Sequence, residues 1–397
     1  MLEWHPAMKR VYFDNNATTP VDPEVLQAML PYFCEIYGNA SSIHSTGQKA
    51  RSGVEKAREQ VAALLGARAN EVTFTSGGTE SDNLAIQGIV AAAEGEKKHV
   101  IAAKIEHSAV RNTCEALAER GVDVTFVPSG GDGVINPDDV RNALRPETVL
   151  ICIMHANNEL GTVQPVEEIG RIAAEADVWF HTDAVQSAGK IPVNVEKIGC
   201  DSLAISGHKI YAPKGVGALY LRKGTRTQPI LFGGHHERDR RPGTENVAGI
   251  VALGHACEMA RTKLEAESER LSALRNRFEQ GIVAAVPHAR VNGQNAPRTP
   301  NTANITIPFI EGEAMVIALD LRGLSCSTGA ACSSGAVAPS PVLTAIGMQP
   351  AEARATLRFS LGKFTTSEDV DFALRLIPGV AEQLRELSPL YKKPVAV

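Results

Sequence analysis

Ser202-Leu203-Ala204-Ile205-Ser206-Gly207-His208-Lys209 is an apolar run of buried-strand length that closes on a glycine and two basic side chains. A lysine is ordinarily a solvated surface group. At the end of a buried strand inside a cleft, however, desolvation lowers the pKa of the amine and frees it to form a Schiff base. Lys209 is therefore our first candidate for a catalytic amine.

Short apolar runs alternate with helical patterns on both sides of this stretch. The predicted strands cover residues 71–75, 99–103, 122–127, 148–155, 178–182, 202–206 and 216–221. The predicted helices cover 46–65, 79–93, 108–120, 136–144 and 166–176, and Asp22-Pro23-Glu24 is a further helix start. This alternation predicts an α/β fold with a mainly parallel sheet covered by helices on both faces.

The pattern changes after about residue 260. We predict a long helix over 264–282, strands over 302–307 and 356–360, and helices over 313–321 and 367–387. A chain of 397 residues is too long for one ordinary core. We therefore expect an N-terminal arm over 1–20 that packs with the small domain, a large domain over 21–260, and a smaller α+β C-terminal domain over 261–397.

The composition is that of an ordinary globular protein, with 44% hydrophobic and 21% charged residues and a net charge of −5. It gives no reason to expect nucleic acid or a membrane as partner. We expect a cytoplasmic protein, because no apolar run reaches the length of a membrane span and the first residues lack a signal core. Residues 1–7 are interpreted as a short extension. Seven cysteines without C-x-x-C predict reduced thiols and no metal site.

Ser76-Gly77-Gly78-Thr79-Glu80-Ser81 follows a predicted strand and opens a predicted helix. Glycine lets the backbone approach a ligand closely, and the free N–H groups of a helix N-terminus suit phosphate. Taken alone, such a motif is more often a simple turn and helix cap than a phosphate site. It is neither G-x-G-x-x-G nor a P-loop, which argues against a nicotinamide or nucleotide cofactor.

His181-Thr182-Asp183-Ala184-Val185-Gln186 ends a third predicted strand. Asp183 would lie near the same sheet edge as Lys209. A structural interpretation is that Asp183 only caps a helix. Beside a pyridine ring, an aspartate stabilises the protonated ring nitrogen and keeps the ring an electron sink.

Along the chain, the order of residues 76–81, then 181–186, then 206–209 resembles that of fold type I pyridoxal-phosphate-dependent transferases. The resemblance is to the class V aminotransferase group that contains the cysteine desulfurases of the nitrogen-fixation and iron–sulfur-assembly type. The resemblance covers nearly the whole chain. Its other segments are 12–20 (YFDNNATTP), 38–44 (GNASSIH), 106–107 (EH), 157–161 (NNELG), 241–246 (RPGTEN) and 358–362 (RFSLG).

The resemblance implies a role for each matching residue. Lys209 would hold pyridoxal 5'-phosphate as an internal aldimine, and Asp183 would pair with its pyridinium nitrogen. Gln186 and Asn158 would contact the ring hydroxyl, and His107 would stack on the ring and transfer protons. The phosphate would be bound by Thr79, Ser206 and His208, with Gly78 also at the cofactor and Thr244 reaching in from a second subunit of a homodimer. Arg358, with Asn158, would bind the substrate carboxylate, since a guanidinium fork suits a carboxylate.

Ser327-Thr328-Gly329-Ala330-Ala331-Cys332-Ser333-Ser334-Gly335 places a cysteine in a run of small residues. It could be a small buried cysteine in a turn, but the run (325–336) also resembles the nucleophile loop of these desulfurases. Lys209 would then remove the Cα proton of L-cysteine, and the Cys332 thiolate would take the sulfur as a persulfide, leaving L-alanine. A nearby base or positive charge must activate the thiol. Cys326 could be a sulfur relay or a buried strand-end thiol.

The chain departs from the family's sequence pattern at two places. The family often has serine at the position of Ala330, and usually has glutamine before Glu237-Arg238, where this chain has His235-His236. Two adjacent histidines can titrate near neutral pH.

Two alternative functions stay open. A selenocysteine lyase or another aminotransferase-fold enzyme is the first alternative, and a cofactor-bearing scaffold or sulfur-relay protein is the second. The expected partner is a sulfur-acceptor or iron–sulfur scaffold protein.

Overall fold

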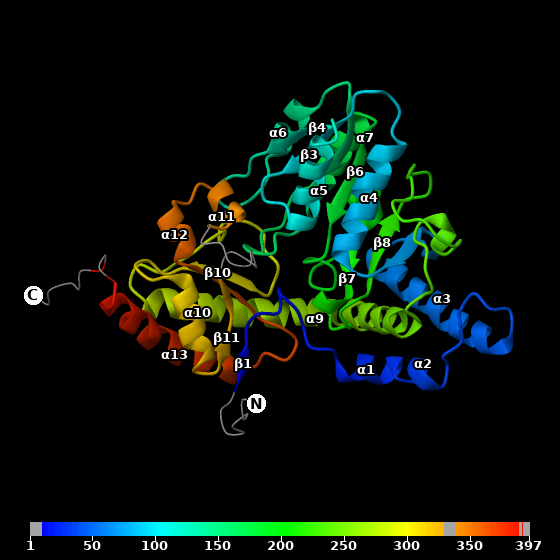
Figure 1. The fold of residues 1–397 in the computed structure, drawn as a ribbon. Coiled ribbons are helices and arrows are strands. Elements are labelled where there is room, and N and C mark those ends of the chain that lie inside the picture. The colour runs from blue at the N-terminus through cyan, green and yellow to red at the C-terminus, as the bar shows by residue number, and fades with distance from the viewer. Residues whose placement is uncertain (1–9, 329–338, 389–390, 392–397) are drawn as a thin grey trace, which may run out of the picture.

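The computed structural model describes residues 10–328, 339–388 and 391. A central sheet with helices on its two faces fills the upper part of Figure 1, and the long helix α9 (Val247–Ala285) runs beneath it. The elements of the C-terminal third lie at one end of α9 (Figure 1). Cys332, the predicted nucleophile, lies outside the described residues.

The central sheet contains seven strands in the order β2-β8-β7-β6-β5-β3-β4. Its strands are β2 (Val72–Thr75), β3 (His99–Ala103), β4 (Asp123–Val127), β5 (Thr148–Cys152), β6 (Trp179–Asp183), β7 (Ser202–Ser206) and β8 (Gly217–Leu221). Only the two pairings made by β8 are antiparallel. The prediction of a mainly parallel sheet is therefore confirmed, although β5 ends at Cys152 and not at the predicted residue 155.

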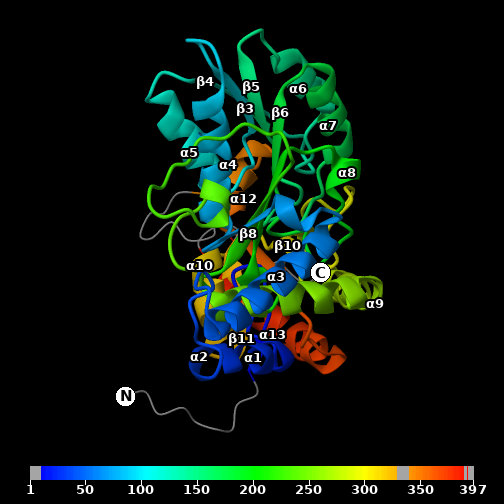
Figure 2. The ribbon, with the colours of Figure 1, turned by 90° about the vertical axis from the view of Figure 1, so that its right-hand side faces the viewer.

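Helices cover both faces of this sheet because its strands are apolar on both sides. The helices of this part are α3 (Ser45–Leu65), α4 (Gly78–Ala92), α5 (Ser108–Ala118), α6 (Pro137–Ala143), α7 (Val166–Glu175) and α8 (Val195–Ile198). Successive residues of a strand point to opposite faces, so Val100 of β3 packs in one core with α4 and α5. Its neighbour Ile101 packs in another core with α6 and α7. Figure 2 shows the two helix layers on either side of the sheet.

A second, antiparallel sheet forms in the C-terminal third, in the order β12-β13-β10-β9. Its strands are β9 (Arg290–Val291), β10 (Thr302–Thr306), β12 (Ser327–Thr328) and β13 (Thr356–Ser360). The helices here are α10 (Gly312–Asp320), α11 (Pro341–Ala345), α12 (Pro350–Arg354) and α13 (Ser367–Glu386). Near the N-terminus, β1 (Val11–Tyr12) pairs in parallel with β11 (Leu324–Ser325), and α1 (Pro23–Met29) and α2 (Pro31–Cys34) follow. Val11 and Phe13 thereby join the core of the second sheet.

The start of α9 corrects the sequence analysis, which began this helix at residue 264. The helix begins at Val247, where the Asn246 side chain accepts a hydrogen bond from Gly249 N (3.1 Å). Its first turns carry small residues that let it pack closely on α3; a β-carbon on Gly254 would lie only 2.5 Å from Ala57 Cα. Residues of α9 contribute to both main cores. The predicted domain boundary at 260 falls inside this helix, and the division into three parts stays a prediction.

Candidate active site

Three predicted motifs meet at one edge of the central sheet. The strands β2, β6 and β7 run in the same direction, so their carboxyl ends share that edge. A β-carbon on Gly78, after β2, would lie 2.7 Å from Val185 Cγ2, after β6, and 3.6 Å from Ser206 Cβ, at the end of β7. A side chain at Gly78 would therefore be crowded, and glycine is required for this close approach.

Lys209 ends a short 3-10 helix, Gly207–Lys209, that follows β7 directly. Its Nζ donates hydrogen bonds to Asn16 O (2.6 Å) and Ala17 O (2.7 Å). The N-terminal segment that follows β1 thus lies against the predicted catalytic amine, at a separation of more than 190 residues in the sequence.

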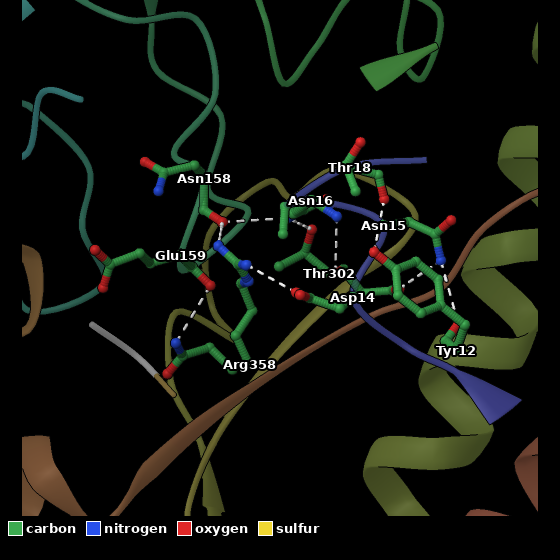
Figure 3. A network of polar contacts seen from close by, with 12 residues as sticks. Tyr12, Asp14, Asn15, Asn16, Thr18, Asn158, Glu159, Thr302 and Arg358 are labelled. Carbon is green, nitrogen blue, oxygen red and sulfur yellow. Dashed lines mark hydrogen bonds and ion pairs between the residues drawn. The ribbon is translucent and has the colours of Figure 1, made fainter. Parts of the chain in front are cut away.

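Asn16 joins several candidate residues and was not singled out from the sequence. Its Nδ2 donates to Asn158 O (3.2 Å) and to Thr302 Oγ1 (2.8 Å), as Figure 3 shows. Its backbone oxygen accepts from Gln186 Nε2 (3.0 Å) as well as from Lys209. The structure therefore brings Lys209, Gln186 and Asn158 together around one buried asparagine.

Asp183 ends β6 and is buried, and its Oδ1 accepts from Val185 N (2.8 Å). Burial raises the pKa of the Asp183 carboxyl, while the nearby His107, the hydrogen bond from Val185 N and the charge of Lys209 lower it. His107 caps the N-terminus of α5 and its Nδ1 accepts from Ala109 N (3.1 Å). A buried carboxylate with so few donors is suited to a cationic partner.

Arg358 lies in β13 and is only 1% exposed. Its two terminal nitrogens donate to Asn158 O (3.1 Å) and to Asp14 Oδ1 (2.9 Å), which Figure 3 shows from close by. Among the described residues, Arg358 Nε and Asn158 Oδ1 are buried without a hydrogen-bond partner. Unpartnered buried polar atoms are costly, so a polar ligand at this place would be stabilised. The ion pair with Asp14 was missed in the sequence analysis.

The remaining predicted phosphate ligands lie at the same edge with different exposure. Thr79 is exposed in the first turn of α4, and His208 Nδ1 lies 3.1 Å from Thr18 Oγ1. Burial, and then the positive charge of Lys209, lower the pKa of His208 to about 4. Thr244 is exposed beside Gly243, which with Ser76 lines a small hollow.

Cys326 and His235, whose roles the sequence left open, both lie in described parts of the structure. Cys326 lies between β11 and β12 and is buried, and burial raises the pKa of its thiol, which favours the interpretation as a structural thiol. His235 is exposed, and its Nδ1 lies 2.5 Å from Asp239 Oδ1.

Glu159 is a buried carboxyl next to Asn158, and its importance was not apparent from the sequence. Its Oε2 accepts from Ser340 Oγ (2.5 Å), and its backbone oxygen accepts from Asn304 Nδ2 (3.2 Å). Burial raises the pKa of Glu159 to about 7, although Ser340 and the charge of Arg358 act in the opposite direction. Glu159 thus ties the start of α11 to the loop that contacts Arg358.

Glu159→Gln is expected to change how stability depends on pH. Because burial raises the pKa of Glu159 above its ordinary 4.5, this carboxyl binds a proton more tightly in the folded protein than in the unfolded chain, and its contribution to wild-type stability falls as pH rises from 4.5 to about 7. Glutamine does not titrate and can still accept from Ser340. The variant should gain on the wild type by up to about 1.4 kcal/mol for each pH unit in that interval. Denaturant unfolding at pH 5 and pH 8 measures this, and an equal difference at both would contradict it.

The described residues contain neither a cluster of metal ligands nor a membrane-spanning helix. Within residues 10–328, 339–388 and 391, no three His, Cys, Asp or Glu side chains are grouped so that they could hold a metal ion. None of the helices described over the same ranges has the length and apolar character needed to cross a membrane.

Comparison with known proteins assigns the sequence to a family over most of its length. Residues 11–372 match the family model described as aminotransferase class-V. A relative named cysteine desulfurase IscS, from Dictyoglomus turgidum, is 47% identical over 387 residues, which are 97% of this chain and 98% of the relative.

Solved structures show the same likeness. A NifS-like protein superimposes with a TM-score of 0.88 at 38% identity, over 94% of this chain and all of that protein (100%). A structure described as SspA in complex with cysteine superimposes with a TM-score of 0.80 at 40% identity, over 89% of this chain and 99% of that one. The fold is therefore that of NifS-like fold type I enzymes.

Proposed function

The chain belongs to the class-V aminotransferase family and is a cysteine desulfurase, and from this premise we propose that its sheet-edge site removes sulfur from L-cysteine with pyridoxal 5'-phosphate held on Lys209. The observation that carries the proposal is the meeting of the Lys209 amine, the buried Asp183 carboxyl and the Gly78 turn at one edge of the sheet. No single one of the three motifs would suffice.

The residues present fit this cofactor. The buried carboxyl of Asp183 suits a protonated pyridine nitrogen, whose positive charge would favour the ionised form of the acid. Asn158 Oδ1 is buried without a partner among the described residues, as expected for a group that contacts a ligand. Gly78 opens α4, whose free N–H groups suit a phosphate. We assign phosphate contacts to Thr79, Ser206 and His208, and to Thr244 of a second copy in a homodimer.

The chain's own residues bind the substrate and move its proton. Arg358 would hold the carboxylate of cysteine, since its Nε is buried and unpartnered among the described residues. The Lys209 amine would accept the Cα proton, and His107, exposed at the start of α5, would assist in proton transfer. When bound, pyridoxal phosphate supplies an electron sink for the negative charge left at Cα.

Cys332 is the residue that we propose accepts the sulfur from the substrate. The Cys332 thiolate would attack the substrate sulfur, forming an S–S bond while the Cβ–S bond breaks and its electron pair goes to Cβ. Cβ would then take up a proton to become the methyl group of alanine, and the proton held by Lys209 would return to Cα. The described residues before and after this segment support the assignment. Ser327 is registered opposite Arg358 in the sheet, and Ser340 is bonded to Glu159. The persulfide would then pass to an acceptor protein, such as an iron–sulfur scaffold.

Reduction with borohydride followed by peptide mapping tests the cofactor assignment. Purified protein should be yellow, and the reduced cofactor should be recovered on the peptide that contains Lys209, because only an amine that holds the cofactor covalently is fixed by the reagent. Recovery on a different lysine, or on none, would contradict the assignment of this site.

Arg358→Lys is expected to lower kcat/KM for cysteine by about one to two decades. Lysine keeps the charge but loses the planar fork, and the loss of a charged hydrogen bond costs roughly 1.5–3 kcal/mol. The matched control is Arg354→Lys, which changes an exposed arginine at the end of α12 and should leave kcat/KM unchanged. An unchanged kcat/KM in Arg358→Lys would remove Arg358 from the substrate site.

A further inference from the structure

Lys190 is a second amine beside the site, and none of the roles above uses it. It follows β6 closely in the sequence, and its Nζ donates to Gln186 Oε1 (2.8 Å) and to Asn16 Oδ1 (3.2 Å). Lys190 and Lys209 line the same cavity, whose other walls include Tyr211 and Met259. Asn16 is thus bonded to one lysine through its side chain and to the other through its backbone oxygen.

The surroundings of Lys190 disfavour the positive charge of its amine. Burial, and then the positive charges of Lys209 and Arg358, lower the pKa of Lys190 to about 7. The cavity also contains charged groups that face it from α9 and from the N- and C-terminal segments, namely Asp22, Lys263, Glu267 and Lys363. Asp22 is paired with Lys363, and none of the ion pairs among the described residues includes Lys190. The amine is therefore held by two side-chain amides.

These contacts fix which way the Gln186 amide points. Below about pH 7 Lys190 is an ammonium group and can only donate, so Gln186 turns its oxygen toward Lys190 and its Nε2 away from it. The backbone oxygen of Asn16, which can only accept, favours the same orientation. One Nε2 hydrogen is then donated to Asn16 O (3.0 Å), which leaves the second for another acceptor. Asn16 is fixed in the same manner, since its Oδ1 accepts from Lys190 and from Asn301 Nδ2 (3.0 Å).

We propose that Lys190 is a positioning residue that orients the Gln186 amide, so that the remaining Nε2 hydrogen is donated to the ring oxygen of bound pyridoxal phosphate. The inference rests on the proposed function, in which Gln186 contacts this oxygen. A donor aimed at an oxygen favours its ionised form, and an amide oxygen aimed at it disfavours that form. Lys190 therefore acts on the cofactor through Gln186 and does not touch it.

The test is a pH titration of the absorbance of the cofactor-loaded protein. In Lys190→Met the Gln186 oxygen loses its cationic partner and the amide is held only by the bond from Nε2 to Asn16 O, so the second Nε2 hydrogen is aimed less firmly. The midpoint of the pH-dependent absorbance change should therefore move upward by about half a pH unit or more. Lys190→Gln, which can itself bond to Asn16 but also accepts, should move it in the same direction and serves if the methionine variant fails to fold. Lys190→Arg, which can only donate, should restore the wild-type midpoint. An unmoved midpoint in Lys190→Met or Lys190→Gln would overturn the proposal.

A double-mutant comparison separates orientation from simple charge. The loss of a positive charge near the cofactor could also move the midpoint, but that effect would persist without Gln186. If Lys190 acts through Gln186, then Lys190→Met should cause no further shift in a Gln186→Ala background. A shift of equal size in both backgrounds would overturn the proposal. The matched control is Lys197→Met, an exposed lysine of α8, which should leave the midpoint in place.

The wild-type protein distinguishes this inference from the proposed function. A wild type that takes up no pyridoxal phosphate, or holds it away from Lys209, contradicts both. A yellow wild type that is reduced on Lys209, together with a Lys190→Met variant of identical titration, contradicts only the role of Lys190.

Discussion

Cys332→Ala is expected to abolish sulfur release from cysteine, by at least about a thousandfold, while the protein stays folded and yellow. Cofactor and substrate are assigned to Lys209, Asp183 and Arg358, which the substitution leaves in place. Ser333 and Ser334, next in the sequence, are far weaker nucleophiles at neutral pH and cannot replace a thiolate.

The control for this variant is Cys34→Ala, which removes an exposed free cysteine at the end of α2 and should leave sulfur release intact. Selenocysteine provides the second comparison. Loss with cysteine but retention with selenocysteine would indicate a desulfurase with residual lyase ability, because selenium leaves more readily than sulfur. Full retention with cysteine would overturn the persulfide mechanism and leave only the cofactor assignment.

Lys209→Arg should reduce alanine formation by at least about a thousandfold. A guanidinium keeps the positive charge and can donate to the backbone oxygens of Asn16 and Ala17, so the fold around it should persist. It can neither hold the cofactor covalently nor accept the Cα proton, because it stays protonated. Alanine quantification and borohydride mapping measure the two losses.

Lys214→Arg is the matched control for Lys209→Arg, since Lys214 is exposed a short distance along the chain. It should form alanine at the wild-type rate. Wild-type alanine formation by Lys209→Arg would show that another group performs the chemistry and would remove Lys209 from the mechanism.

The buried strands were the most predictable part of the fold. The bounds of β3, β7 and β13 are those expected from the sequence. β3 and β7 have apolar centres, and β13 alternates polar with apolar residues, which is the strand period. The start of α9 was not predictable in the same way, since its first turns are short side chains whose helical position is fixed by contact with α3. Two-residue strands such as β11 and β12 exist only because distant partners pair with them.

In the candidate site, too, some residues could be predicted from local sequence pattern and others depend on contacts between distant segments. Asp183 and Lys209 could be proposed from local pattern, since Asp183 ends a buried strand and Lys209 follows another by three residues. Asn16, Glu159 and Lys190 could not, because their importance comes from hydrogen bonds between distant segments, such as that from Asn16 to Thr302. Arg358 was assigned through resemblance alone, and its burial and its pairing with Asp14 became apparent only in three dimensions. The role of Cys332 stays a prediction, since it lies outside the described residues.

The most direct test of the central claim is to incubate the purified, pyridoxal-phosphate-loaded protein with L-cysteine, without an acceptor, and to measure alanine and protein-bound persulfide together. We predict one alanine for each persulfide formed in the first turnover, with the extra sulfur recovered on the peptide that contains Cys332. Alanine without a persulfide on that peptide, or a keto acid in place of alanine, would contradict it.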